Sequence, residues 1–497
     1  MKCLPLFICL LLYFSSFTIT TTKAQSFTGY DVTSYAGVYG TLYNPANILD
    51  HRVRADVNLA GFSFSEANNI VKLKLKLKNT DDGAAIDMPT NRTGRMGFQT
   101  DVLGPSFMIR LSDKHAFAVT TRFRTQVNAD KLSAPLINLS LLKDVSSLNH
   151  LPITAPGGAV QAQAWNELAF TYSRQVAISN FGVWKAAVSL KLTGGQGAAY
   201  FKADKVRFIY NDSLRTNQAL QEAYGGATNA TGTVNLAYAD FMDDWGDQYN
   251  YRFFRQPGIA ADIGVTYEYR DAMQVYETAY NENTLNYKWK AGASITDIGS
   301  IKYNASPNSA TARFTGQTYI FNDLVVPADS SNLPQIIRYY KTTFNGTGGA
   351  PYFTMALPTT LHVMFDYSFN KWFSTAAHFS MPLLGSTFPY YTGTHTLSML
   401  TVTPRAELPW IGAYLPISYH FAAGLQVGSA LRLGPLVAGS ATAISSLLLG
   451  KGKGIDAYFI LRIPFFGYRE YERQEATPTH IKLSKLAQKI FGCPRKL

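Results

Sequence analysis

The side chains with the clearest chemical potential are basic residues spaced two apart along extended segments. Lys72 and Lys74 lie in a run in which every second residue is lysine, and Arg122 and Arg124 repeat the spacing. Residues two apart share one face of a strand, so these cations would gather on a single surface. An enclosed cationic surface attracts anions. The same groups could instead pair with neighbouring acids, and the sequence leaves both interpretations open.

Histidines and acids show little catalytic or metal-binding pattern. His362 and His378 could approach each other across a hairpin, but two histidines are more typical of ordinary polar residues than of a metal site. An acidic group around Trp245 lacks the glycine-punctuated spacing of a calcium loop; it comprises Asp240, Asp243, Asp244 and Asp247. The sequence has no nucleophile elbow, zinc-protease motif, phosphate-binding glycine loop or Cys-x-x-Cys pair. We therefore expect no enzyme, no catalytic residues, no cofactor and no metal.

Alternation of apolar and polar residues predicts that strands carry these side chains. Residues 71–78 alternate strictly between aliphatic residues and lysine, which places the lysines on one face of a strand but scatters them around a helix. Similar alternation covers residues 117–128, 167–173, 185–193, 261–270, 287–296, 360–368 and 425–433. The charged side chains expected on the polar faces are Lys72, Lys74, Arg110, Arg122, Arg124, Lys185, Lys191, Asp262, Glu268, Arg270, Lys288, Lys290 and Arg432.

These segments predict an all-β fold, a transmembrane antiparallel β-barrel of about 14 strands, within a range of roughly 12 to 16. Several segments run about ten residues, the length of a tilted membrane strand, and have aromatic residues near their ends. Short turns alternate with long polar connections, expected to be extracellular loops, at residues 79–97, 129–158, 211–256 and 302–351. A soluble β-sandwich or propeller would alternate similarly, but these apolar faces are largely free of charge and no propeller repeat is present.

Composition agrees with a β-rich membrane or secreted protein. The 497 residues are 46% hydrophobic, 13% aromatic and only 16% charged, whereas about 25% charge is typical of soluble proteins. The mean hydropathy of −0.05 excludes a polytopic helical membrane protein. The formal net charge of +12 is dispersed along the chain, which argues against a nucleic-acid partner.

The first 24 residues have the features of a secretory signal peptide. Lys2 precedes an apolar core over residues 4–17, and cleavage near Ala24 would follow small residues. Cleavage would remove two of the three cysteines and leave only Cys493, so no internal disulfide is expected. An exported protein without disulfides is typical of the bacterial envelope.

The segment at 25–51 is small and aromatic, and a turn at Asn44-Pro45-Ala46 precedes the first predicted strand. It resembles the amino-terminal segment of the long-chain fatty-acid transporter (FadL-like) barrels and the related PorV-like barrels. The matching residues are Ala36, Gly37, Tyr43, Asn44, Pro45 and Ala46. The resemblance implies that Tyr43 to Ala46 belong to a plug inside the lumen of a barrel formed by residues 52–467.

The mature chain also resembles a Bacteroidota family of outer-membrane barrels that has no assigned activity. The stretches that carry this resemblance are residues 43–48, 264–270, 292–299 and 431–435. The resemblance implies a location in the outer membrane of a Gram-negative, Bacteroidota-like bacterium. It implies nothing about cargo.

Residues 468–497 follow the predicted barrel as a basic periplasmic tail. Leu483, Leu486, Ala487 and Ile490 recur at helical spacing beside several lysines, which predicts a short amphipathic helix, with disorder as the alternative.

The predicted function is that of a passive channel or transporter for small amphiphilic or anionic molecules. The alternative is a PorV-like accessory subunit of an envelope secretion or surface-protein assembly complex, in which the long loops would contact a protein partner. A secreted adhesin would remain only if the barrel prediction is wrong. Expected partners are outer-membrane lipid or lipopolysaccharide, a small amphiphilic ligand and an envelope protein, with no nucleic acid.

Overall fold

The computed structural model describes residues 26–49, 52–74, 83–86, 93–112, 114–133, 149–155, 157–179, 181–211, 213, 225–244, 250–270, 287–320, 333–384, 392–447 and 454–466. The expected signal peptide and carboxyl-terminal tail lie outside these ranges. Among the residues that the structure describes, no helix is long and apolar enough to cross a membrane.

Fourteen antiparallel strands form a closed barrel, because the first strand pairs with the last as well as with the second. The wall consists in order of β1 (Val53–Asn68), β4 (Thr93–Leu103) continued by β5 (Ser106–Ser112), β6 (His115–Ser133), β8 (Ala159–Ile178), β9 (Gly182–Asn211), β11 (Gln256–Tyr269), β12 (Trp289–Asn304), β15 (Tyr352–Ala356) continued by β16 (Thr360–Ser368), β17 (Phe373–Pro382), β18 (Met399–Glu407), β19 (Ile411–Tyr414) continued by β20 (Ile417–His420), β21 (Gly424–Val427) continued by β22 (Ser429–Leu433), β23 (Leu436–Ser440) and β24 (Gly454–Phe466). The prediction of an antiparallel barrel of about 14 strands is confirmed.

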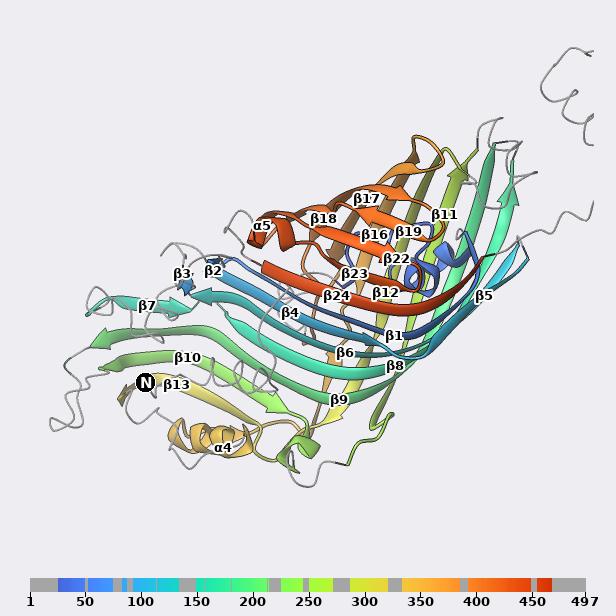
Figure 1. Cartoon of the computed structure of the whole chain (residues 1–497). Coiled ribbons are helices and arrows are strands. Elements are labelled where there is room, and N and C mark those ends of the chain that lie inside the picture. Colours follow the sequence, from blue (N-terminus) through green and yellow to red (C-terminus); the bar gives the residue numbers. More distant parts are fainter. Residues whose placement is uncertain are drawn as a thin grey trace, which may run out of the picture.

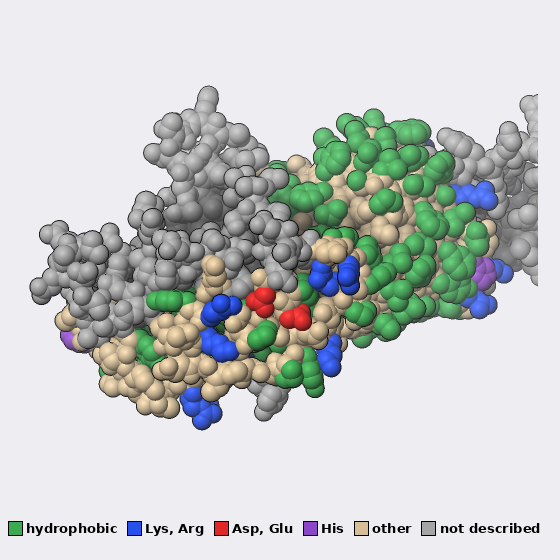
Figure 2. Space-filling model, turned by 90° about the horizontal axis from the view of Figure 1, so that it is seen from below, with side chains coloured by type: hydrophobic (Ala, Val, Ile, Leu, Met, Phe, Trp, Pro, Cys, Tyr) green, Lys and Arg blue, Asp and Glu red, His purple; other side chains and the backbone are tan. Residues whose placement is uncertain are grey.

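Exposed hydrophobic side chains form an apolar belt on the outside of the barrel, and on the face seen in Figure 2 they gather over one half of the molecule. Large hydrophobic side chains point outward from successive strands, as in Phe170, Leu190, Ile263 and Val363, all of them exposed. Polar residues between them on the same strands are buried inside. Closing the sheet pairs the backbone groups of every wall strand, and an apolar outer face then suits the hydrocarbon of a bilayer.

The barrel wall is much taller on one side than on the other (Figure 1). β9 has 30 residues, and its second half pairs with β7 (Pro152–Ala155) and with β10 (Gly226–Tyr238). β10 pairs in turn with β13 (Ala310–Ile320), which pairs with β14 (Thr347–Gly348). Two helical elements, η4 (Asp240–Asp244) and α4 (Leu333–Thr343), pack against these added strands. Parts of the stretches that were expected to be loops therefore form strands and helices.

The lysine-rich run does not form a wall strand. β2 (Val71–Lys74) pairs only with β3 (Gly83–Ile86), in a two-stranded sheet separate from the barrel. Residues 71–74 are therefore not part of the wall, and the expectation that Lys72 and Lys74 face the lumen stays a prediction. Alternation alone does not distinguish a wall strand from a hairpin in the connection between β1 and β4. A second connection, between β23 and β24, carries the short helix α5 (Ala443–Leu447).

Residues 26–49 lie inside the barrel and include the short helices η1 (Gly37–Leu42) and η2 (Pro45–Leu49). Every residue of this segment is buried. Its aromatic rings pack against the wall, with Phe27 edge-on to Tyr458 and Tyr30 edge-on to Tyr414. We call residues 26–49 the plug.

Candidate functional site

The lumen is the candidate site, and its plug fits the wall at a notch made by two glycines. Gly264 of β11 and Gly292 of β12 both face Asn44. A Cβ at Gly264 would overlap Asn44 Oδ1 and lie 2.9 Å from Pro45 Cδ. The Asn44 amide donates hydrogen bonds to the carbonyl oxygens of Val265 (3.1 Å) and Ala293 (3.5 Å). Three of the stretches that carry the sequence resemblance thus meet in space at this notch.

The residues around Asn44 secure the same contact. Asn44 Oδ1 accepts a hydrogen bond from the Ala46 backbone N–H at 2.9 Å, which holds the Asn-Pro-Ala turn in shape. Ser294 of β12 donates to the Tyr43 carbonyl, and the Tyr43 hydroxyl donates to the Ser26 carbonyl. Complete burial raises the pKa of Tyr43 well above its ordinary value, so it acts as a neutral hydrogen-bond donor.

A histidine pair ties the plug to β16 and β17, the strands that follow β12 in the wall. His362 of β16 and His378 of β17 contact each other through their ring nitrogens at 3.0 Å. His378 Nδ1 lies 2.9 Å from Asp31 Oδ2 of the plug, and His362 Nε2 lies 3.1 Å from Thr296 Oγ1. Both rings use both nitrogens in these contacts. No group of three or more metal-ligating side chains occurs in the described part of the chain.

Buried arginines hold the plug at the end of the barrel that has the short turns. Arg462 of β24 pairs with Asp56 of β1 at 3.0 Å, and Asp56 also accepts the Val38 backbone N–H at 3.0 Å. Arg432, predicted to face the lumen, is fully buried and lies over the Tyr35 ring at 4.3 Å. Its guanidinium also donates to the carbonyl oxygens of Leu408 and Pro409, in the turn before β19. Arg432 therefore contacts both the plug and this turn.

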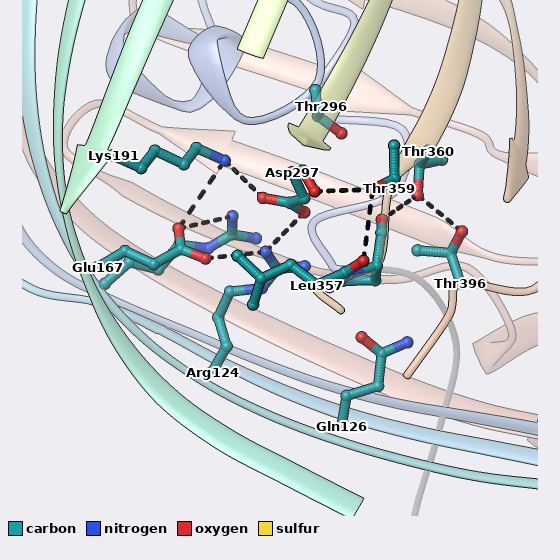
Figure 3. Close-up of polar contacts among 12 residues, drawn as sticks. Arg124, Gln126, Glu167, Lys191, Thr296, Asp297, Leu357, Thr359, Thr360 and Thr396 are labelled. Atoms are coloured by element: carbon teal, nitrogen blue, oxygen red, sulfur yellow. Dashed lines mark hydrogen bonds and ion pairs between the residues drawn. The ribbon is translucent and has the colours of Figure 1, made fainter. Parts of the chain in front are cut away.

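Beyond the plug lies a buried cluster of charges that we call the luminal ion-pair network (Figure 3). Arg124 of β6 pairs with Glu167 of β8 at 3.0 Å and with Asp297 of β12 at 2.7 Å. Lys191 of β9 pairs with Asp297 at 2.6 Å and with Asp262 of β11 at 2.8 Å. The remaining members are Arg122 and Asp101, which pair with each other. Burial makes such charges costly unless each is paired, and here they neutralise one another.

A β-bulge brings Asp297 into this network. The register of β11 and β12 shifts between Ala261 and Ile263, and Asp297 adopts a φ of +58°. Thr296 and Asp297 are consequently both buried on the inward side, although they are adjacent. The Asp297 carbonyl accepts a hydrogen bond from Thr359 at 2.9 Å, where the wall is interrupted between β15 and β16. Sequence alternation carried no signal for this bulge, so Asp297 was missed.

Two further clusters lie toward the end of the lumen that has the short turns. Lys185 of β9 pairs with Glu268 of β11 at 2.7 Å, and Arg270 pairs with the same carboxylate at 3.0 Å. Arg405 of β18, which sequence reasoning also missed, pairs with Asp366 at 2.5 Å and with Glu407 at 3.0 Å. Each of these bases therefore pairs with an acid on its own strand or on a nearby one.

The remaining predicted luminal cations lie at the margins. Lys288 precedes β12, and its Nζ lies 5.2 Å from the centre of the Tyr367 ring. Tyr367 is on the face of β16 opposite the buried Asp366, so the prediction that Lys288 faces the lumen is wrong. Lys290 is buried, with its Nζ 5.4 Å from the centre of the Tyr287 ring, and Arg110 is half-buried near the carboxyl end of β5.

A second segment lies inside the lumen, next to the luminal ion-pair network. Residues 392–397, which we call the inserted segment, leave the edge of β15, where the Ala356 N–H donates to the Thr392 carbonyl at 3.0 Å. The segment then reaches the inward side chains of β6 and β8. Its last residue, Leu397, packs on Gly97 of β4, and Thr396 contacts Thr360 at 2.9 Å (Figure 3).

The His395 side chain secures this segment. Its Nε2 lies 2.8 Å from Asp130 Oδ2, and its Nδ1 contacts the Thr396 carbonyl at 2.8 Å. Burial alone would lower the pKa of His395. The hydrogen bond and the negative charge of Asp130 have the larger effect, so the pKa lies above its ordinary value.

The sequence profile of one protein family matches residues 45–441, which is most of the chain and begins within the Asn-Pro-Ala motif. The chain belongs to the family of unknown function DUF5723. None of the curated proteins matches it. The DUF5723 match spans the glycine notch, the luminal ion-pair network and the inserted segment.

Solved membrane barrels resemble the structure at low sequence identity. A Pseudomonas aeruginosa FadL homologue is 8% identical, with 90% of this chain and 100% of that chain covered and a TM-score of 0.38. The Pseudomonas putida toluene transporter TodX is 10% identical, with 89% and 99% covered and a TM-score of 0.32. The translocator domain of the Neisseria meningitidis autotransporter NalP is 8% identical, with 84% and 90% covered and a TM-score of 0.29.

Proposed function

We propose that this protein is a channel of the bacterial outer membrane that its own plug closes in the conformation described here. The supporting observation is what fills the lumen. Eight strands make a barrel that wall side chains can fill, whereas larger barrels leave a channel or hold a plug. In this 14-stranded barrel a separate segment, residues 26–49, occupies the space, and many of its contacts are polar. A passage opens when that segment shifts.

The cargo that fits best is a small, uncharged polar or amphiphilic molecule. A path that selects anions needs cations that no nearby acid neutralises. The described bases of the luminal ion-pair network are instead paired with carboxylates. Some buried polar atoms that face the lumen have no partner in the described part of the chain, including Thr403 Oγ1 and both amide atoms of Gln426. Such atoms suit a hydrated interior, because buried polar groups normally find a partner in protein or water.

The apolar belt is suited to contact with lipid acyl chains around the barrel. Outer-membrane lipid or lipopolysaccharide is therefore the proposed partner of the outer face.

A reversible tether between plug and wall tests the function. Ser173 Oγ of β8 lies 3.5 Å from the Ala46 carbonyl oxygen, so Ala46→Cys with Ser173→Cys would join them, in a Cys493→Ser background free of other mature-chain thiols. In liposomes, the oxidised protein should pass no small uncharged solute and the reduced protein should resume uptake. The two single-cysteine variants are the controls and should not respond to reductant. Equal uptake in the oxidised and reduced states of the double variant would overturn the proposal.

A further inference from the structure

Four amide side chains form a regular array beneath the inserted segment. Gln126 pairs in register with Gln163, and Asn128 with Gln161, across the β6–β8 ladder. Directly opposed residues of antiparallel strands have neighbouring side chains on the same face. All four are buried on the inward face. We call them the amide ladder.

The amide ladder binds mainly the backbone of the inserted segment. Gln161 Oε1 accepts the Gly393 N–H at 2.7 Å, and Asn128 Oδ1 accepts the His395 N–H at 2.8 Å. The His395 carbonyl accepts hydrogen bonds from Asn128 Nδ2 at 2.8 Å and from Gln126 Nε2 at 2.5 Å. These contacts use groups that every non-proline residue carries, so they would accept other extended peptide backbones.

The inserted segment leaves part of this capacity unused. Gln126 Oε1 and Gln161 Nε2 have no protein partner among the described residues, although the two side chains are only 3% and 1% exposed. An unpartnered buried acceptor or donor costs about 1–3 kcal/mol. One free acceptor and one free donor therefore remain for a ligand that offers an additional N–H and C=O.

Asp130 adds a preference for a side chain. It lies two residues beyond Asn128 on the inward face of β6, and it pairs with His395 at 2.8 Å. Two residues is the spacing of successive positions on one face of a strand. A ligand whose basic side chain occupies the position of His395 would satisfy the same carboxylate.

We propose that the amide ladder and Asp130 form a binding site for short extended peptides with a basic residue, and that the inserted segment occupies this site as an internal mimic. The inference rests on the proposed function only in placing the site along the channel. Peptides fit better than sugars, because the ladder presents acceptors to N–H groups and paired donors to one carbonyl. A sugar offers hydroxyl groups without that fixed alternation.

Equilibrium binding to the full-length barrel in detergent tests the site without requiring transport. The probe is the tetrapeptide Gly-Thr-Lys-Thr, which follows residues 393–396 with lysine in place of histidine. His395→Gly should raise its affinity at least tenfold, because the inserted segment then competes less well. In that background, Asn128→Leu should lower the affinity about tenfold or more, since two hydrogen bonds are removed.

The matched control is Gln426→Leu, which removes a buried luminal amide from β21, outside the ladder. It should leave peptide affinity unchanged in the same background. A peptide with glutamate in place of lysine should bind at least tenfold more weakly, because it would place like charge against Asp130. Heat-modified migration in denaturing gels verifies that each variant retains a folded barrel.

Three results would overturn the inference. They are equal peptide affinity in the Asn128→Leu and Gln426→Leu variants, no gain from His395→Gly, or tighter binding of maltotriose than of the peptide. Peptide binding without solute uptake in liposomes would instead contradict the channel proposal and leave the site intact. The two proposals therefore fail separately.

Discussion

Valine at position 264 would separate the plug from the wall at the glycine notch. A Cβ there overlaps Asn44 Oδ1 and comes within 2.9 Å of Pro45 Cδ, and valine adds two further methyl groups in the same space. Valine is well suited to the strand itself, so β11 should keep its pairing with β9 and β12. The strain therefore falls on the plug.

The size of the effect follows from the hydrogen bonds that the displaced plug would break. The two hydrogen bonds from the Asn44 amide and the bond from Ser294 to the Tyr43 carbonyl contribute about 1 kcal/mol each. Forcing extra methyl groups into a packed site costs about 1–3 kcal/mol more. A total of roughly 4–6 kcal/mol favours release of the plug by a factor on the order of a thousand or more.

Single-channel recording in planar bilayers measures this release. Gly264→Val should turn rare openings into frequent or sustained ones, and a cysteine placed at Ala46 should react faster with a water-soluble maleimide. The control is Gly348→Val, because no atom lies within 4 Å of a Cβ added at Gly348. Unchanged conductance together with unchanged maleimide reaction in Gly264→Val would refute the reasoning that the notch retains the plug.

Three other substitutions probe the inserted segment, the luminal ion-pair network and the belt. Because Asp130 raises the pKa of His395, the charged form stabilises the seated segment at low pH, and this contribution disappears as pH rises above 6.5 through the raised pKa. In the Gly264→Val background, openings should therefore increase with pH, and Asp130→Asn should flatten that dependence; a profile identical in both would contradict the pairing. Arg124→Met leaves Glu167 and Asp297 undercompensated and should lower the free energy of unfolding by about 3–5 kcal/mol in urea titrations, whereas the exposed Arg313→Met should change little. Ile263→Lys places a charge in the middle of β11 on the outward face and should cost about 2–4 kcal/mol, against at most about 1 kcal/mol for Ser300→Lys, which lies toward the end of the barrel away from the short turns; equal costs would mean that the belt does not face lipid.

Strand alternation was enough to predict the wall, because lipid outside and a polar lumen inside impose opposite demands on successive residues. Segments 117–128, 185–193 and 360–368 all fall within wall strands, with their polar side chains buried inside. The same rule did not predict the pairing of residues 71–74, which lie outside the wall. A hairpin in a connection between strands alternates equally well, and nothing in the run itself records which strand it pairs with.

The chemistry of the lumen was less predictable, because it depends on pairing across strands distant in sequence. Arg124 and Asp297 are separated by 173 residues, and only the β12 bulge turns Asp297 inward. Counting bases on polar faces suggested a cationic interior. The acids that neutralise them became apparent only once the strands were in register. Likewise, no motif in the sequence marked residues 392–397 as a segment that binds inside the lumen.

The two closures differ in chemistry and in the strands that hold them. The plug relies on a steric fit at Gly264 and Gly292 and on backbone hydrogen bonds to Asp56 of β1 and Arg462 of β24, which pair with each other. The inserted segment relies on neutral amides of β6 and β8 and on one titratable pair. Closures arranged in series limit flux together, so releasing one alone raises passage only to the limit set by the other. A cargo that competes for the amide ladder would displace the inserted segment on arrival. The plug would still keep the lumen closed to solutes that cannot displace it.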